Sequence, residues 1–182
     1  MVSPLVCVKA NTMTTTTTST MMGKTPTVGD KAPNFELVNG KGADGKATKF
    51  NLLEACKNGP VVVAFFPGAF TGTCTKEMCN FSETWAEFAK LSAQFIGVSV
   101  DSWHAQKAFA EKHNIKVPFA SDFEHKTVDA WNVVWNSWWG PVAKRATFVV
   151  DRTGTITYAN VQSDANLEPN YAEIKNALNG LK

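Results

Sequence analysis

Two cysteines, Cys74 and Cys79, lie close together in segment 66–79, which reads FPGAFTGTCTKEMC. An apolar strand is expected before this segment and a long helix within it, so Cys74 falls in or beside the first turn of that helix. The free backbone N–H groups and the positive dipole end of a helix N-terminus favour a thiolate over a thiol. The position of Cys74 therefore indicates a nucleophilic or redox-active cysteine.

The residues before Cys74 can form a small binding loop. Pro67 and Gly68 allow the backbone to approach a small ligand, and the hydroxyl of Thr71 can donate a hydrogen bond to it or accept one. Either Thr71 or Thr73 can act as the helix N-cap, and Glu77 lies where a capping carboxylate can reach back. We expect this loop to surround the sulfur atom.

Helix geometry limits what Cys74 and Cys79 can do together. Two helical positions five residues apart have Cα atoms about 8.7 Å from each other. A disulfide needs a Cα separation of roughly 4.4–6.8 Å. A bridge between these cysteines therefore requires the first turn or two of the helix to unwind, which suits a redox cycle better than a permanent crosslink.

Other chemistries have less support. Zinc sites use tighter cysteine spacings with further Cys or His ligands, whereas His104, His113 and His125 form no ligand pattern here. No G-x-S-x-G motif occurs and no histidine can be assigned as general base, which disfavours a hydrolase. We expect neither a metal nor an organic cofactor.

Alternating strands and helices are expected to position these residues, which predicts an α/β sandwich with a mixed β-sheet covered by helices. The run Val61–Phe66 is apolar throughout, as is typical of a strand buried on both faces. The other predicted strands are Phe35–Val38, Ala47–Phe50, Phe95–Val100, Thr147–Asp151 and Thr155–Ala159. Helices are predicted at Asn51–Lys57, along the apolar stripe from Met78 to Leu91, at Ser102–His113 (with Ala105, Ala108 and Phe109 inward) and at Pro169–Leu181.

Length and charge favour one domain without a nucleic-acid or membrane partner. The chain has 182 residues and a formal net charge of +2, so it lacks the concentrated basic charge of those classes. Residues 1–29 contain the run Thr14–Thr18 and no acidic side chain, and we expect a disordered leader followed by a domain at 30–182. We expect a cytoplasmic protein, with organellar targeting by the leader as the alternative.

The pattern Pro67-x-x-x-Thr71-x-x-Cys74, extended by Glu77 and preceded by an apolar strand, resembles the peroxiredoxin active-site motif. The later segment 140–151 resembles the strand that carries the active-site arginine of that family, here Arg145. The resemblance covers roughly residues 28–181, and the second cysteine five positions on is similar to the peroxiredoxin Q (bacterioferritin comigratory protein) type. Segment 70–72 departs from the commonest Q-type pattern, which has proline after the threonine.

This resemblance implies a thioredoxin-like three-layer sandwich and a thiol peroxidase that acts on hydrogen peroxide or alkyl hydroperoxides. It implies that Cys74 is the peroxidatic cysteine, that Pro67, Thr71 and Arg145 complete its pocket, and that Glu77 positions the arginine. Cys79 would be the resolving cysteine, and a thioredoxin-like reductant would reset the disulfide. The protein would be a monomer or a homodimer.

Alternatives remain open from the sequence. One is a thioredoxin-fold oxidoreductase acting on protein disulfides, and another is a redox sensor. Arg145, taken alone, can be an ordinary surface arginine. Cys56 is expected to be a small core residue, with a resolving role as the minor alternative to Cys79.

Tryptophans gather in one segment, at Trp131, Trp135, Trp138 and Trp139. Most are expected to lie in the core. We hypothesise that Trp138 and Trp139, just before the arginine, wall the mouth of the active site or form a dimer contact.

Overall fold

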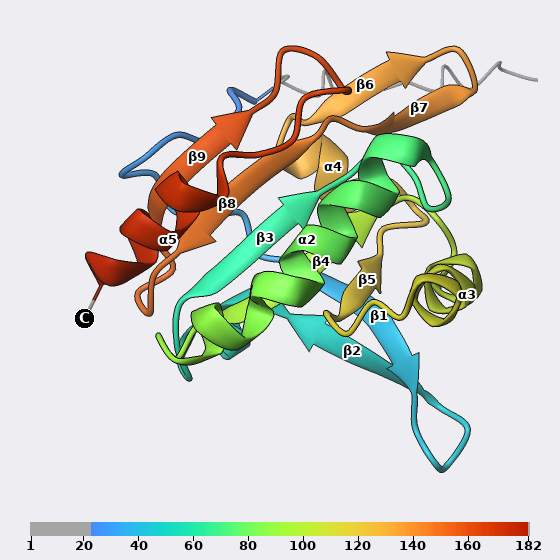
Figure 1. Cartoon of the computed structure of the whole chain (residues 1–182), viewed down its shortest axis with the longest axis horizontal. Coiled ribbons are helices and arrows are strands. Elements are labelled where there is room, and N and C mark those ends of the chain that lie inside the picture. Colours follow the sequence, from blue (N-terminus) through green and yellow to red (C-terminus); the bar gives the residue numbers. More distant parts are fainter. Residues whose placement is uncertain (1–22, 182) are drawn as a thin grey trace, which may run out of the picture.

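The computed structural model describes residues 23–181 (Figure 1). Its strands are β1 (Glu36–Lys41), β2 (Ala47–Asn51), β3 (Val61–Phe65), β4 (Gln94–Ser99), β5 (Phe119–Ser121), β6 (Val134–Ser137), β7 (Gly140–Ala143), β8 (Ala146–Val150) and β9 (Ile156–Val161). Its helices are α1 (Leu52–Cys56), α2 (Gly72–Ala89), α3 (Trp103–His113), α4 (Lys126–Ala130) and α5 (Tyr171–Asn179).

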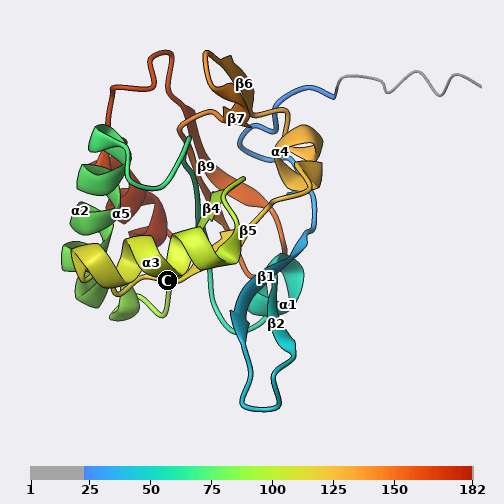
Figure 2. The ribbon, with the colours of Figure 1, turned by 90° about the vertical axis from the view of Figure 1, so that its right-hand side faces the viewer.

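Seven of the described strands form one mixed sheet in the order β2-β1-β5-β4-β3-β8-β9. Strands β3, β4 and β5 run parallel at its centre, and β8 and β9 continue it in antiparallel pairing. Helices α2, α3 and α5 cover one face, whereas α1 and α4 lie on the other (Figure 2). The predicted mixed sheet covered by helices is confirmed.

Strand β3 shows why the central sheet needs a continuous apolar sequence. All five of its side chains are fully buried. Val61, Val63 and Phe65 enter the apolar cluster beside α1 and α4, while Val62 and Ala64 enter the cluster beside α2, α3 and α5. This alternation follows the two-residue period of a strand, so each face of the sheet needs its own apolar set.

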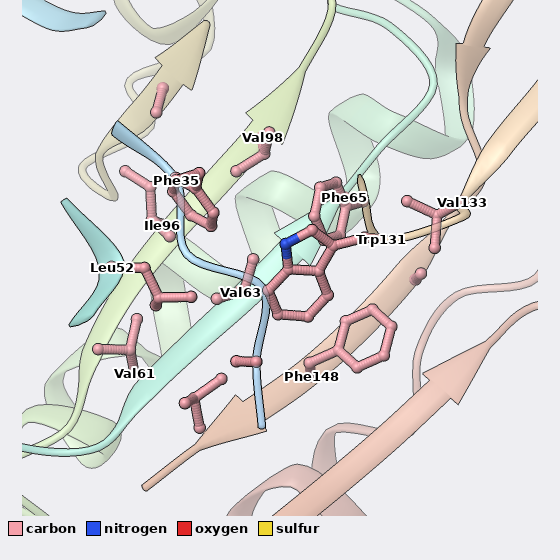
Figure 3. Packing of buried hydrophobic residues seen from close by; sticks show 14 of the residues in the cluster. Phe35, Leu52, Val61, Val63, Phe65, Ile96, Val98, Trp131, Val133 and Phe148 are labelled. Atoms are coloured by element: carbon pink, nitrogen blue, oxygen red, sulfur yellow. The ribbon is translucent and has the colours of Figure 1, made fainter. Parts of the chain in front are cut away.

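Trp131 fills the first of these clusters (Figure 3). Its ring lies 5.3 Å from the ring of Phe65 and 4.8 Å from that of Phe148, measured between centroids. The indole Nε1 donates a hydrogen bond of 3.0 Å to the carbonyl oxygen of Pro33, so the buried polar atom is satisfied. Trp131 is therefore a core residue, as expected.

Several elements escaped the sequence prediction because they are short or lack a period. Strand β5 has three residues and α4 has five, too few for a hydrophobic repeat. The β6–β7 hairpin lies in the tryptophan-rich segment, which does not alternate. In α3 the expected inward face is partly wrong, because Ala108 is exposed. Gln106 is buried there instead, and its amide donates to the backbone oxygen of Ala120 at 3.0 Å.

Contacts with the domain begin before the predicted boundary at residue 30. The hydroxyl of Thr25 donates to the carbonyl oxygen of Asn132 at 3.0 Å, Pro26 is buried, and the backbone N–H of Gly29 donates to the carbonyl oxygen of Ile156 at 2.9 Å. The rest of the predicted leader, residues 1–22 with Cys7, lies outside the described residues. Among residues 23–181, none of the helices is long and apolar enough to cross a membrane.

Candidate active site

Cys74 lies where the chain leaves the buried centre of the sheet. Strand β3 ends at Phe65, a short loop follows, and α2 begins at Gly72 with Thr71 as its N-cap. The first backbone hydrogen bond of the helix joins the N–H of Thr75 to the carbonyl oxygen of Thr71 at 2.9 Å. Cys74 is the third residue of α2, so its N–H precedes that bond and belongs to the electropositive end of the helix.

The same residue also lies on the apolar face of α2. Cys74 is 1% exposed and packs in the cluster that contains Met78 and Phe81, which follow it at helical spacing. Its sulfur is thus fixed between the sheet and the helix start.

The loop before α2 is held by one hydrogen bond to Asp101, which follows β4, and by one within the loop itself. The backbone N–H of Ala69 donates to Oδ2 of Asp101 at 2.8 Å, and the hydroxyl of Ser99 donates to the same oxygen at 2.7 Å. The hydroxyl of Thr71 donates to the carbonyl oxygen of Gly68 at 3.0 Å. Thr71 is the N-cap by backbone position but makes no side-chain cap.

Arg145 lies in the two-residue link between β7 and β8 and reaches the sulfur from across the site. Its Nη2 atom is 3.4 Å from Sγ of Cys74. The carbonyl oxygen of Ala165 accepts hydrogen bonds from Nε at 3.0 Å and from Nη2 at 2.8 Å. The arginine is 2% exposed, which excludes the interpretation as an ordinary surface residue.

Glu77 forms a buried ion pair with Arg145 through Oε2 and Nη1. Its side chain is fully buried, so the expectation that it caps the helix is wrong. The reason is its phase: Glu77 lies three residues after Cys74 and shares the inward face of α2. Its other oxygen, Oε1, has no hydrogen-bond partner among the described residues.

Burial and neighbouring charges shift the pKa values of both Glu77 and Arg145. Burial raises the pKa of Glu77 to about 7, and the charge of Arg145 opposes that rise without cancelling it. Burial alone would lower the pKa of Arg145, but the carboxylate of Glu77 and the sulfur of Cys74 attract its charge and raise the pKa. The guanidinium is therefore a permanent cation beside the sulfur.

A cleft of about 640 Å³ opens over these groups. The β6–β7 hairpin stands at the end of the molecule where α2 begins (Figures 1 and 2). Its tryptophans line the cleft; Trp138 is 91% exposed and Trp139 is 43% exposed. The remaining lining residues include Pro67, Thr71, Gly72, Thr73, Cys74, Trp135, Arg145 and Ala165. One cleft thus brings together all the residues of the predicted pocket, which are Pro67, Thr71, Cys74 and Arg145.

The profile of the AhpC/TSA family matches residues 28–159 of the chain. The chain belongs to the AhpC/TSA family. Wheat (Triticum aestivum) chloroplastic peroxiredoxin Q is 35% identical over 130 residues, which are 71% of this chain and 57% of that protein. Peroxiredoxin Bcp of Bacillus subtilis is 36% identical over 136 residues, covering 71% of this chain and 81% of the relative. The resemblance to peroxiredoxins of the Q type is confirmed.

A solved structure of this AhpC/TSA fold also matches. Peroxidoxin BcpB from Mycobacterium tuberculosis superposes with a TM-score of 0.69 at 30% identity, covering 85% of this chain and 96% of that one. The predicted thioredoxin-like sandwich is therefore correct. The chain spans between 57% and 66% of the length of the plant peroxiredoxin Q relatives from wheat and Sedum lineare.

The other cysteines of this AhpC/TSA chain differ in position. Cys79 lies in the intact helix α2 and is half-buried, and its pKa is raised by burial and by the nearby charge of Glu83. Cys56 is buried in the cluster on the opposite face of the sheet from Cys74. Burial and the nearby charge of Asp151 raise the pKa of Cys56 to about 11. Cys56, Cys74 and Cys79 are all free thiols.

Two site residues of this family member were missed from the sequence. Asp101 follows β4, which runs parallel to β3. Because the carboxyl ends of parallel strands meet at one edge of a sheet, the position of Asp101 directly after a predicted strand could have placed it near the loop that follows β3. Ala165 acts through its backbone oxygen, for which its residue type gives no signal. Among residues 23–181, no group of three or more His, Cys, Asp or Glu side chains is placed to hold a metal ion.

Proposed function

We propose that this chain is a thiol peroxidase that reduces hydrogen peroxide and organic hydroperoxides at Cys74. The observation that carries the proposal is the 3.4 Å contact between Nη2 of Arg145 and Sγ of Cys74, at a helix N-terminus and beneath an open cleft. A permanent cation and a helix start both stabilise negative charge on the sulfur. They also stabilise the charge that develops on the leaving oxygen when the O–O bond breaks.

The first step transfers one peroxide oxygen to the enzyme. The thiolate of Cys74 attacks that oxygen, the O–O bond breaks, and the second oxygen leaves as hydroxide or alkoxide and takes up a proton. The products are a sulfenic acid on Cys74 and water or an alcohol. Because the hydroxyl hydrogen of Thr71 is used by Gly68, its oxygen is suited to accept a hydrogen bond from the peroxide O–H.

The second step forms a disulfide. The thiolate of Cys79 attacks the sulfenic sulfur of Cys74, and the hydroxide that leaves becomes water. Cys79 is favoured over Cys56 because Cys56 lies across the sheet from Cys74, whereas Cys79 follows it on the same helix. A dithiol reductant of the thioredoxin type then restores both thiols by exchange.

The tryptophans support a substrate larger than hydrogen peroxide. A water molecule occupies about 30 Å³ in the liquid, so a cleft of about 640 Å³ holds far more than two oxygen atoms. Trp135 and Trp139 pack edge to face at 5.6 Å and give one side of the cleft an apolar wall. An organic hydroperoxide can place its carbon chain there while its O–O group reaches Cys74.

Peroxide consumption with dithiothreitol as reductant tests the proposal. We expect turnover in the wild type and in Cys56→Ala, and complete loss in Cys74→Ala. In a separate experiment without reductant, the Cys79→Ser variant should consume one equivalent of peroxide and accumulate a sulfenic acid, which dimedone traps for mass measurement. Turnover that survives Cys74→Ala would refute the peroxidase mechanism. Peptide mapping that finds a Cys74–Cys56 bridge would refute the assignment of Cys79.

The cytoplasmic location and the state of assembly expected from the sequence stay predictions. Residues 1–22 of the predicted leader lie outside the described residues.

A further inference from the structure

The segment between β9 and α5, residues 162–170, passes over the first turns of α2. Its Ala165 carbonyl oxygen holds two nitrogens of Arg145. Three residues later, Glu168 contacts α2 directly. The segment therefore connects the arginine of the site to the helix that carries both reactive cysteines.

Glu168 makes three side-chain contacts, two of them on α2. Its Oε1 pairs with Nζ of Lys76 at 2.6 Å, and its Oε2 accepts from Nδ2 of Asn80 at 2.7 Å. The hydroxyl of Tyr171, at the start of α5, donates to the same Oε2 at 3.0 Å. Burial would raise the pKa of Glu168, but the hydrogen bonds from Lys76, Tyr171 and Asn80 lower it, so the carboxylate is charged at neutral pH.

The positions of Lys76 and Asn80 matter for the second step of the reaction. Lys76 lies between Cys74 and Cys79, within the stretch that must unwind before the disulfide can form, and Asn80 directly follows Cys79 at the border of that stretch. Contacts that fix both residues to the 162–170 segment stabilise the helical form of that stretch. Lys76 is largely exposed and its ion pair adds little, whereas the contact of Asn80 is partly buried.

We propose that Glu168 is a positioning residue that latches the first turns of α2 onto the 162–170 segment. The latch keeps Ala165 in place to hold Arg145, which favours the attack on peroxide, and it opposes the unwinding that Cys79 needs to reach the sulfenic sulfur. Glu168 therefore sets the lifetime of the sulfenic acid on Cys74 before the disulfide forms. A longer life gives more time for a second peroxide to oxidise it to sulfinic acid. This inference rests on the proposed function.

The test separates the two steps by stopped-flow tryptophan fluorescence. The peroxide-dependent phase reports attack by Cys74, and the peroxide-independent phase reports disulfide formation. In Glu168→Ala we expect disulfide formation to be about five- to tenfold faster, from the loss of contacts to a charged group. We expect attack on peroxide to be at least twofold slower, and intact mass to find a smaller sulfinic acid fraction at high peroxide.

Glu87→Ala is the matched control. Glu87 pairs with Lys175 at 2.6 Å and so also joins α2 to α5, but it lies beyond Cys79, in turns that do not have to unwind. We expect both rates to match the wild type in this variant. Lys76→Gln and Asn80→Ala test the latch from the helix side if Glu168→Ala does not fold, as judged by circular dichroism.

Only opposite changes in the two rates support the latch. Rates equal to those of the wild type would overturn it, and so would a parallel decrease in both, since that outcome marks general loss of packing. A failure of the proposed function is seen separately in the wild type, as the absence of a Cys74–Cys79 disulfide after one equivalent of peroxide.

Discussion

The buried carboxyl group of Glu77 makes the stability of the protein depend on pH in an unusual direction. Most paired carboxylates have a lowered pKa in the folded protein, but burial raises the pKa of Glu77 from 4.5 to about 7. The folded protein therefore binds this proton more tightly than the unfolded chain. Between pH 4.5 and about 7 the unfolded chain releases the proton first, so the free energy of unfolding falls as the pH rises.

The size of this effect follows from the pKa difference. One pKa unit corresponds to about 1.4 kcal/mol, so the contribution of Glu77 falls by about 3 kcal/mol between pH 4.5 and 7 and is constant above that. Because the side chain is fully buried, solvent screening does not reduce the value. Other carboxyl groups also titrate in this range, and the comparison with Glu77→Gln removes their contribution.

Urea unfolding at pH 5 and at pH 8 measures the effect in the wild type and in Glu77→Gln. The amide introduced by this substitution does not titrate, so the free energy of unfolding of the wild type relative to the variant should be lower at pH 8 than at pH 5 by a few kcal/mol. Glu87→Gln is the control, because its exposed carboxylate has a lowered pKa and should give a small change of the opposite sign. Equal pH dependence in the wild type and Glu77→Gln would refute the assignment of a raised pKa.

Other substitutions probe the rest of the site. Arg145→Met should lower the rate constant for the reaction of Cys74 with peroxide by about 10²–10³-fold, whereas Arg152→Met, at an exposed arginine, should leave it unchanged. A loss below twofold in stopped-flow kinetics would contradict the role of the Arg145 guanidinium. Trp139→Ala should raise KM for cumene hydroperoxide and leave that for hydrogen peroxide unchanged, and an equal rise for both would exclude a specificity role. Cys56, with a pKa of about 11, should resist iodoacetamide at pH 8 until the protein is unfolded in urea; rapid labelling of the native protein would contradict its burial.

The sequence predicted those parts of the site that follow a local pattern. The apolar run of β3 and the apolar stripe of α2 placed Cys74 at a strand-to-helix junction. A strand buried on both faces has a continuous apolar sequence, whereas a helix buried on one face has apolar residues at spacings of three and four. The inward position of Glu77 was not predicted. Because Glu77 lies three residues after Cys74, the phase of the stripe was sufficient to reject its predicted capping role.

What the sequence could not predict depends on distant segments. Ala165 binds Arg145 through a backbone oxygen, and its residue type carries no signal for that contact. Glu168 meets Lys76 and Asn80 because the 162–170 segment lies against α2, a tertiary contact between residues more than eighty positions apart. The β6–β7 hairpin is defined by its turn at Gly140, which has φ 125°, rather than by alternation.

The way Arg145 is held links the chemistry of the site to the shape of α2. A guanidinium that is 2% exposed needs acceptors in place of water, and it finds them in Glu77 on α2 and Ala165 on the neighbouring segment. Unwinding of the first two turns of α2 displaces Cys74 and Glu77 together. The arginine would then lose the sulfur and its counter-ion in one event, so in the proposed mechanism the form that attacks peroxide and the form that makes the disulfide exclude each other.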